Sequence, residues 1–175
     1  MINVFQLILR EQYPHLPEVV RRFHETRLGE FTGKATIKGG KGLMVRALRK
    51  IGGFPAPAEG EVALKIRVIR SEVQERVQRQ FGEVQFSSVF TRINRQNLLS
   101  EDFGMFRFYF SLRALRNGIE WQFERWDFAG IPMPELLSPD AEITETVGED
   151  GKYTFAVLVK FPIIGILMDY AGSLE

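Results

Sequence analysis

The sequence predicts a mainly β protein, an antiparallel β-barrel or sandwich of lipocalin-like type with minor α content. Three observations carry this prediction. Apolar and polar residues alternate in roughly nine or ten segments that recur about every ten residues. The turn signal Asn117-Gly118 separates two of these segments. Helical spacing is confined to residues 1–27 and to a stretch near 42–51, so two N-terminal helices and one short helix are expected.

The chain is expected to be a single domain, 1–175. Its 175 residues are enough to bury a core, and no repeat, low-complexity tract or linker divides them. The N-terminal helices are predicted around Phe5 to Leu9 and after Pro17, which suits the first turn of a helix. Tyr13-Pro14 separates them, and Gly29 ends the unit.

The helix near residues 42–51 is predicted from an apolar stripe of Leu43, Ala47 and Ile51, with Met44 and Leu48 beside it and Arg46, Arg49 and Lys50 opposite. This pattern favours a stripe that faces the core, and a membrane-surface helix is the alternative. The glycine run at 39–42 lacks the hydroxyl residue that a P-loop places after its lysine. A strand-to-helix turn is therefore favoured over weak anion binding at the helix start.

The strands are predicted from alternation, and glycines or turn residues mark their ends. Gly130 to Pro134 contains two prolines and is expected to be a loop, because proline cannot continue a central strand. The predicted strands cover residues 31–38, 62–68, 73–81, 84–90, 106–112, 119–123, 143–147, 153–161 and 163–170.

Composition excludes several classes of function. The 23 basic and 22 acidic residues leave a net charge of +1, so no nucleic-acid partner is expected. Without cysteine and with only His15 and His24, no metal site, catalytic histidine or other cofactor is expected. No export signal is recognisable, and the longest apolar run, Phe161 to Met168, is too short to span a membrane. A cytoplasmic location without direct membrane insertion is expected.

Four charged residues occupy positions that alternation assigns to the apolar side of a strand: Glu75 and Arg79, Arg125, and Glu145. Burying these charges is costly unless they pair or meet a polar ligand. Three interpretations remain open: anchors for a ligand, a structural salt-bridge network, or a register shifted by an undetected bulge. In the ligand interpretation Arg79 and Arg125 bind an anionic group, and Glu75 and Glu145 orient them. The apolar wall is formed by Phe108, Phe110, Trp121 and Phe123.

Several short segments follow one another in a distinctive order: His24–Gly33, Gly39–Pro55 (GGKGLMVRALRKIGGFP), Arg79–Gly82, Glu101–Gly104, Gly130–Pro134 followed by Leu137 and Pro139, and Phe161–Gly165 with Tyr170 and Gly172. Their order and spacing resemble a family of uncharacterised bacterial domains known as DUF4166. The resemblance implies no established activity, and it implies similarity to domains attached to saccharopine-dehydrogenase-like NAD-binding modules or to membrane segments. This chain lacks a dinucleotide fingerprint, so it is not expected to bind NAD. At Val77 the family often carries tryptophan, which implies a roomier pocket here if the position lines one.

The sequence thus favours a non-catalytic barrel that binds a small apolar or amphipathic molecule. The alternative is an interaction or regulatory module for a partner oxidoreductase or membrane protein, with an exposed patch at Ile131, Met133, Leu136 and Leu137. An enzyme that uses Glu75 and Glu145 for acid–base chemistry is the third hypothesis.

Overall fold

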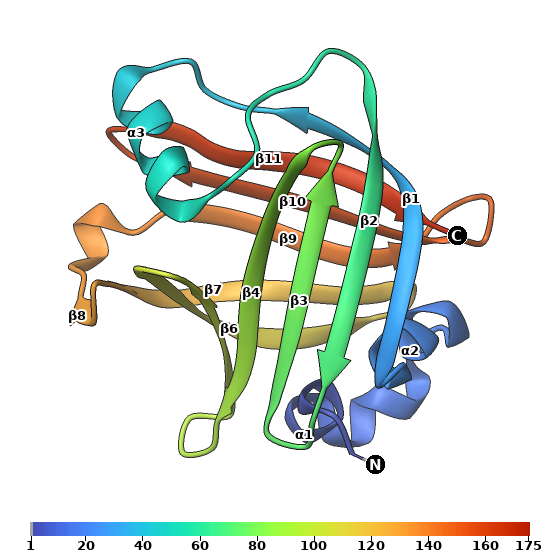
Figure 1. Cartoon of the computed structure of the whole chain (residues 1–175). Coiled ribbons are helices and arrows are strands. Elements are labelled where there is room, and N and C mark those ends of the chain that lie inside the picture. Colours follow the sequence, from blue (N-terminus) through green and yellow to red (C-terminus); the bar gives the residue numbers. More distant parts are fainter. Residues whose placement is uncertain (1) are drawn as a thin grey trace.

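The protein is a closed antiparallel barrel. In residues 2–175, which the computed structural model describes, ten strands follow the order β6-β5-β4-β3-β2-β1-β11-β10-β9-β7, and β6 pairs with β7 to close the ring (Figure 1). The predicted mainly β barrel is confirmed. The barrel strands are β1 (Leu28–Lys38), β2 (Glu61–Arg70), β3 (Gln74–Phe81), β4 (Val84–Ile93), β5 (Leu98–Phe103), β6 (Phe106–Leu115), β7 (Gly118–Phe128), β9 (Asp140–Val147), β10 (Tyr153–Phe161) and β11 (Gly165–Leu174).

Helices form at the N-terminus as predicted, and they close one end of the barrel (Figure 1). They are α1 (Val4–Leu9), the 3-10 helix η1 (Arg10–His15) and α2 (Glu18–Glu25). Asn3 caps α1 by accepting a hydrogen bond from the Gln6 amide, and the Gln6 side chain accepts one from the Asn3 amide. This capping box helps α1, a helix of only six residues, to place buried side chains over the lumen.

The orientation predicted for the third helix is wrong. Helix α3 (Leu43–Gly52) forms where expected, but it buries Val45 and Arg49, whereas Leu43 and Ile51 are exposed. The Arg49 guanidinium donates to the backbone carbonyls of Leu167 and Ile166 at 3.1 and 3.5 Å. These bonds turn the Arg49 side of the helix toward β11. The stripe of Leu43, Met44 and Ile51 therefore points away from the barrel.

A bulge in β7 changes which side chains enter the barrel. Tyr109 of β6 pairs with Arg125, but Phe110 pairs with Phe123, so Glu124 is the extra residue. An extra residue exchanges the two faces of the strand beyond it, because side chains alternate with a period of two. The even-numbered Trp126 is consequently buried beyond the bulge, whereas Trp121 is buried before it.

Most other predicted turns and strands are confirmed. The hairpin at Asn117-Gly118 joins β6 to β7, and residues 148–152 join β9 to β10. The segment after Gly130 contains only the two-residue β8 (Ile131–Pro132), paired with β7 outside the ring, and the 3-10 helix η2 (Glu135–Leu137). Strand β5 was not predicted. None of the helices within residues 2–175 is long and apolar enough to cross a membrane.

Candidate functional site

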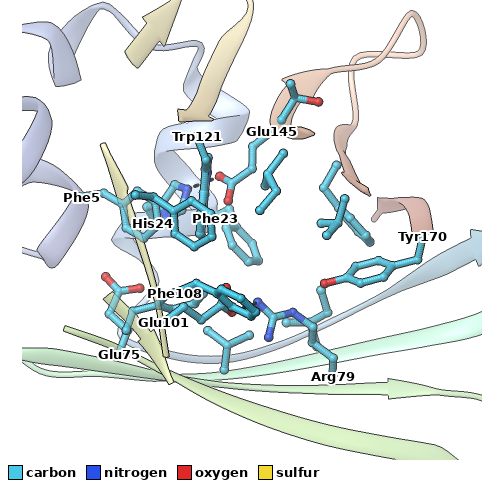
Figure 2. Close-up of a pocket in the computed structure, with 18 of the residues that line it drawn as sticks. Phe5, Phe23, His24, Glu75, Arg79, Glu101, Phe108, Trp121, Glu145 and Tyr170 are labelled. Atoms are coloured by element: carbon cyan, nitrogen blue, oxygen red, sulfur yellow. Dashed lines mark hydrogen bonds and ion pairs between the residues drawn. The ribbon is translucent and has the colours of Figure 1, made fainter. Parts of the chain in front are cut away.

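A small cavity lies inside the barrel and is lined by side chains from strands around the ring and from α1 and α2. Its volume is about 60 Å³. Figure 2 shows Phe5, His24 and Glu75 toward one end of this cavity, and Arg79 and Tyr170 toward the other. A water molecule needs roughly 10–15 Å³ of such space. The cavity therefore has room for a few water molecules or a slim ligand.

Arg79 and Glu101 form the first of three polar pairs in the cavity. Arg79 donates to the Ser88 hydroxyl at 2.7 Å and to Glu101 Oε1 at 3.2 Å. Its guanidinium also lies over the rings of Phe86 and Phe90, an arrangement that favours a cation. The strand register explains why Arg79, Ser88 and Glu101 lie together. Strand β3 pairs with β4, and β4 pairs with β5, so inward residues of these three strands are neighbours.

The ionisation of this pair is strongly affected by burial. Burial raises the pKa of the Glu101 carboxyl to about 7, and Arg79 opposes this only in part. Burial also lowers the pKa of Arg79, but Tyr170 and Glu101 more than offset it, so its pKa lies above the ordinary value. Arg79 is therefore a permanent cation, whereas Glu101 can gain or lose a proton near neutral pH.

Arg70 and Glu75 form the second pair, toward the helical end of the lumen. Arg70 Nε donates to Glu75 Oε2 at 2.8 Å, and Arg70 Nη1 donates to the carbonyl of Thr26 at 2.6 Å. Glu75 is completely buried, with 0% of its surface exposed. Its second oxygen, Oε1, has no hydrogen-bond partner in the described part of the chain. This oxygen is available to a donor from a ligand or water.

His24 and Glu145 form the third pair. His24, in the last turn of α2, lies 2.5 Å from Glu145 Oε2 through its Nε2, and the ring of Phe5 lies 3.8 Å from the imidazole centroid to centroid. When Glu145 is ionised it can only accept, so Nε2 carries the proton. The other nitrogen, Nδ1, has no partner within residues 2–175. Burial and the neighbouring Glu145 raise the pKa of Tyr153 well above its ordinary value.

Aromatic rings supply the apolar wall between these pairs. Trp121 meets Phe5, Phe90 and Phe110 at centroid distances of 5.6, 5.5 and 5.4 Å. The indole Nε1 of Trp121 is buried and finds no acceptor among the described residues. The wall is thus mostly apolar, but Trp121 adds one unused donor to the unpartnered atoms of Glu75 and His24.

The structure brings most of the predicted site residues together. Six of them line the cavity: Glu75, Arg79, Phe108, Phe110, Trp121 and Glu145. Phe123 is not among the lining residues and packs behind Phe108 and Phe110. Whether any of them binds a ligand remains a prediction.

The predicted inward position of Arg125 is wrong. The bulge at Glu124 turns Arg125 to the outer face, where 41% of its side chain is exposed and its guanidinium lies 3.5 Å from the ring centroid of Tyr109. This is the register shift that the third interpretation of the inward charges anticipated. Only Arg79 of the two proposed anion anchors is in the lumen.

Several polar residues of the cavity were not predicted from the sequence. Arg70 continues the even-numbered inward series of β2, and this pattern could have revealed it. Glu101 lies in the unpredicted strand β5, and His24 enters from a helix, where strand alternation gives no information. No group of three or more potential metal-ligating side chains is found within residues 2–175. The groups present can hydrogen-bond a polar ligand or exchange a proton with it.

Comparison with known proteins gives a family and no function. No curated protein matches the chain. The family model described as "Domain of unknown function (DUF4166)" matches residues 16–174, a range that includes all the barrel strands and every cavity residue except Phe5. The resemblance seen in the sequence is thereby confirmed: the chain belongs to the DUF4166 family.

Proposed function

We propose that this domain binds a small apolar or amphipathic molecule inside its barrel. The observation that carries the proposal is an aromatic cavity in the lumen whose lining residues include three with a buried, unpartnered polar atom, namely Glu75 Oε1, His24 Nδ1 and Trp121 Nε1. Each unpartnered buried polar atom costs about 1–3 kcal/mol. A ligand that carries both a donor and an acceptor relieves this cost, and the aromatic wall accommodates its apolar part.

The size of the cavity restricts the ligand. An apolar cavity of roughly 150 Å³ accepts benzene, whereas this one measures about 60 Å³. A slim, unbranched molecule therefore fits better than a ring system. Larger ligands require an aromatic side chain such as Phe108 to move.

Arg79 is the polar anchor of the proposed ligand. Two of its five N–H groups donate within the described structure, to Ser88 and Glu101. Protonation of Glu101, whose pKa is about 7, leaves the charge of Arg79 uncompensated and favours an anionic or strongly hydrogen-bonding group. Arg125 has no part in this proposal because it lies outside the barrel.

Filling the cavity should abolish binding. Val77 lines it and is 3% exposed, so Val77→Phe places a ring in the free space at a cost of about 1–3 kcal/mol from overpacking. Native mass spectrometry, followed by extraction and identification of bound molecules, should detect a stoichiometric ligand in the wild type and none in Val77→Phe. Saturation-transfer NMR with n-butanol and n-butyrate extends the test to weak ligands.

The matched control is Val84→Phe on β4, where the valine is 42% exposed. This variant should retain the ligand. Equal uptake by Val77→Phe and wild type, with both folded by circular dichroism, contradicts binding in the lumen. A wild-type protein that carries no molecule and takes up neither probe contradicts it as well.

The loop after β7 supports the interaction module as a second candidate function. Ile131 and Leu136 are 65% and 84% exposed, whereas Met133 and Leu137 pack partly against the core. A partner oxidoreductase or membrane protein that covers Ile131 and Leu136 should be recovered by affinity capture with the wild type and lost with Leu136→Glu. Recovery that is unchanged by this substitution removes the loop as the contact.

A further inference from the structure

Helix α3 turns its apolar stripe away from the barrel. An α-helix turns about 100° per residue, so Leu43, Met44 and Ile51 fall on one side, opposite Val45 and Arg49. The exposed fractions of those three side chains are 80%, 59% and 51%. An amphipathic helix normally buries this stripe. Here the Arg49 hydrogen bonds to β11 hold the opposite side against the barrel.

The exposed apolar surface of α3 continues onto a neighbouring turn. The turn between β10 and β11 lies beside α3 (Figure 1), and the Gly40 amide donates to the Ile166 carbonyl at 3.1 Å. Ile163 in this turn is 78% exposed. We call α3 and this turn, with the exposed residues Leu43, Met44, Ile51 and Ile163, the α3 face.

The charges of the α3 face are all positive. Residues 39–58 include Lys41, Arg46, Arg49 and Lys50 and no acidic residue, and residues 160–168 include Lys160 and no acidic residue. Of these five cations only Arg49 is buried. On the helix, Arg46 and Lys50 adjoin one edge of the apolar stripe. Exposed apolar side chains flanked by cations are typical of a helix that lies in the interface of an anionic membrane.

We propose that the α3 face docks on an anionic lipid surface, with Leu43, Met44, Ile51 and Ile163 inserted among the lipid chains. A second copy of this chain is a poorer occupant, because two α3 faces would place cations against cations. Four apolar side chains also fall short of the roughly 20–30 residues per side of a stable protein interface. A membrane, in contrast, needs only shallow insertion and negative charge. The docking is peripheral and independent of whether the lumen holds a ligand.

Vesicle co-sedimentation of the full chain tests this. The wild type should bind vesicles of phosphatidylcholine with about a third phosphatidylglycerol and should bind pure phosphatidylcholine vesicles much more weakly; raising the salt to about 0.5 M should release it. Arg46→Gln/Lys50→Gln should reduce the partition onto anionic vesicles about 30-fold. Leu43→Asn/Met44→Asn should reduce it about 100-fold or more.

Leu136→Asn is the matched control, because Leu136 is exposed to 84%, close to the 80% of Leu43, and lies in the η2 loop instead of the α3 face. Its vesicle binding should equal that of the wild type, and all variants should keep the wild-type unfolding midpoint because the replaced side chains are exposed. Wild-type binding that is indifferent to phosphatidylglycerol overturns the proposal. Unchanged binding by the two α3 variants overturns it, and so does an α3-dependent change of oligomeric state without lipid.

Discussion

Arg79→Met is expected to lower the free energy of unfolding by about 3 kcal/mol at pH 8. At this pH Glu101 is mostly ionised in the wild type, since its pKa is about 7. Removing Arg79 leaves a buried carboxylate without its cation and removes the donor to Ser88. Breaking a buried pair by deleting one partner costs about 3–5 kcal/mol. Uptake of a proton by Glu101 keeps the loss near the lower end of this range.

The same variant should lose less stability at pH 5, where Glu101 is protonated in wild type and variant alike. Urea denaturation at both pH values measures the difference. Arg125→Met, which removes the arginine on the outer face, should change the stability by less than about 0.5 kcal/mol. A loss from Arg79→Met that is equal at pH 5 and pH 8 means that the charge of Glu101 does not contribute to it.

Adding Glu101→Leu to Arg79→Met should recover most of the loss, because a buried pair replaced on both sides by apolar groups leaves no unpaired charge. Each residue thus compensates the buried charge of the other, but the pair as a whole adds little to the free energy of unfolding. This separates the structural interpretation from the ligand interpretation. If the double variant is stable but takes up no ligand, the pair is retained for binding.

The barrel was predictable because apolar and polar residues alternate along most of its strands. This alternation is typical of strands that bury only one face. Val62, Leu64, Ile66 and Val68 mark β2 without ambiguity, and their spacing is preserved through the pairings with β1 and β3. Strand β5 escaped because Ser100, Glu101 and Asp102 break the apolar alternation. Glu101 is nevertheless buried and lines the cavity, so the polar residue at an inward position that hid the strand belongs to the candidate site itself.

The candidate site was only partly predictable, for two physical reasons. A bulge adds one residue to a strand without changing its composition, so the exchange of faces at Glu124 leaves no mark in the alternation around Arg125. Contacts between distant segments are also invisible to periodicity: His24 and Glu145 are 121 residues apart in the chain. The predicted orientation of α3 was wrong for a similar reason. The hydrogen bonds of Arg49 to the carbonyls of Ile166 and Leu167 outweigh the preference of the helix's apolar stripe for the core.

Glu101 should make the protein less stable as the pH rises from about 4.5 to about 7. Its pKa is 4.5 in the unfolded reference and about 7 in the folded protein, where burial disfavours the charged form. Between these values the folded protein holds a proton that the unfolded chain has released. The contribution of this group is therefore complete below pH 4.5 and is lost above pH 7. Its size is about 3 kcal/mol, from 1.36 kcal/mol per pKa unit.

Glu101→Gln removes the titratable carboxyl and keeps a side-chain oxygen that can accept a hydrogen bond from Arg79. Urea denaturation at several pH values should show a flatter dependence of the unfolding free energy between pH 4.5 and 7 than in the wild type. Glu124→Gln removes an exposed carboxyl at the bulge and should leave the wild-type profile unchanged. Parallel profiles for Glu101→Gln and wild type show that folding does not raise the pKa of Glu101. In that case the charge of Arg79 stays compensated at neutral pH, and the anchor proposed for the ligand loses its main electrostatic support.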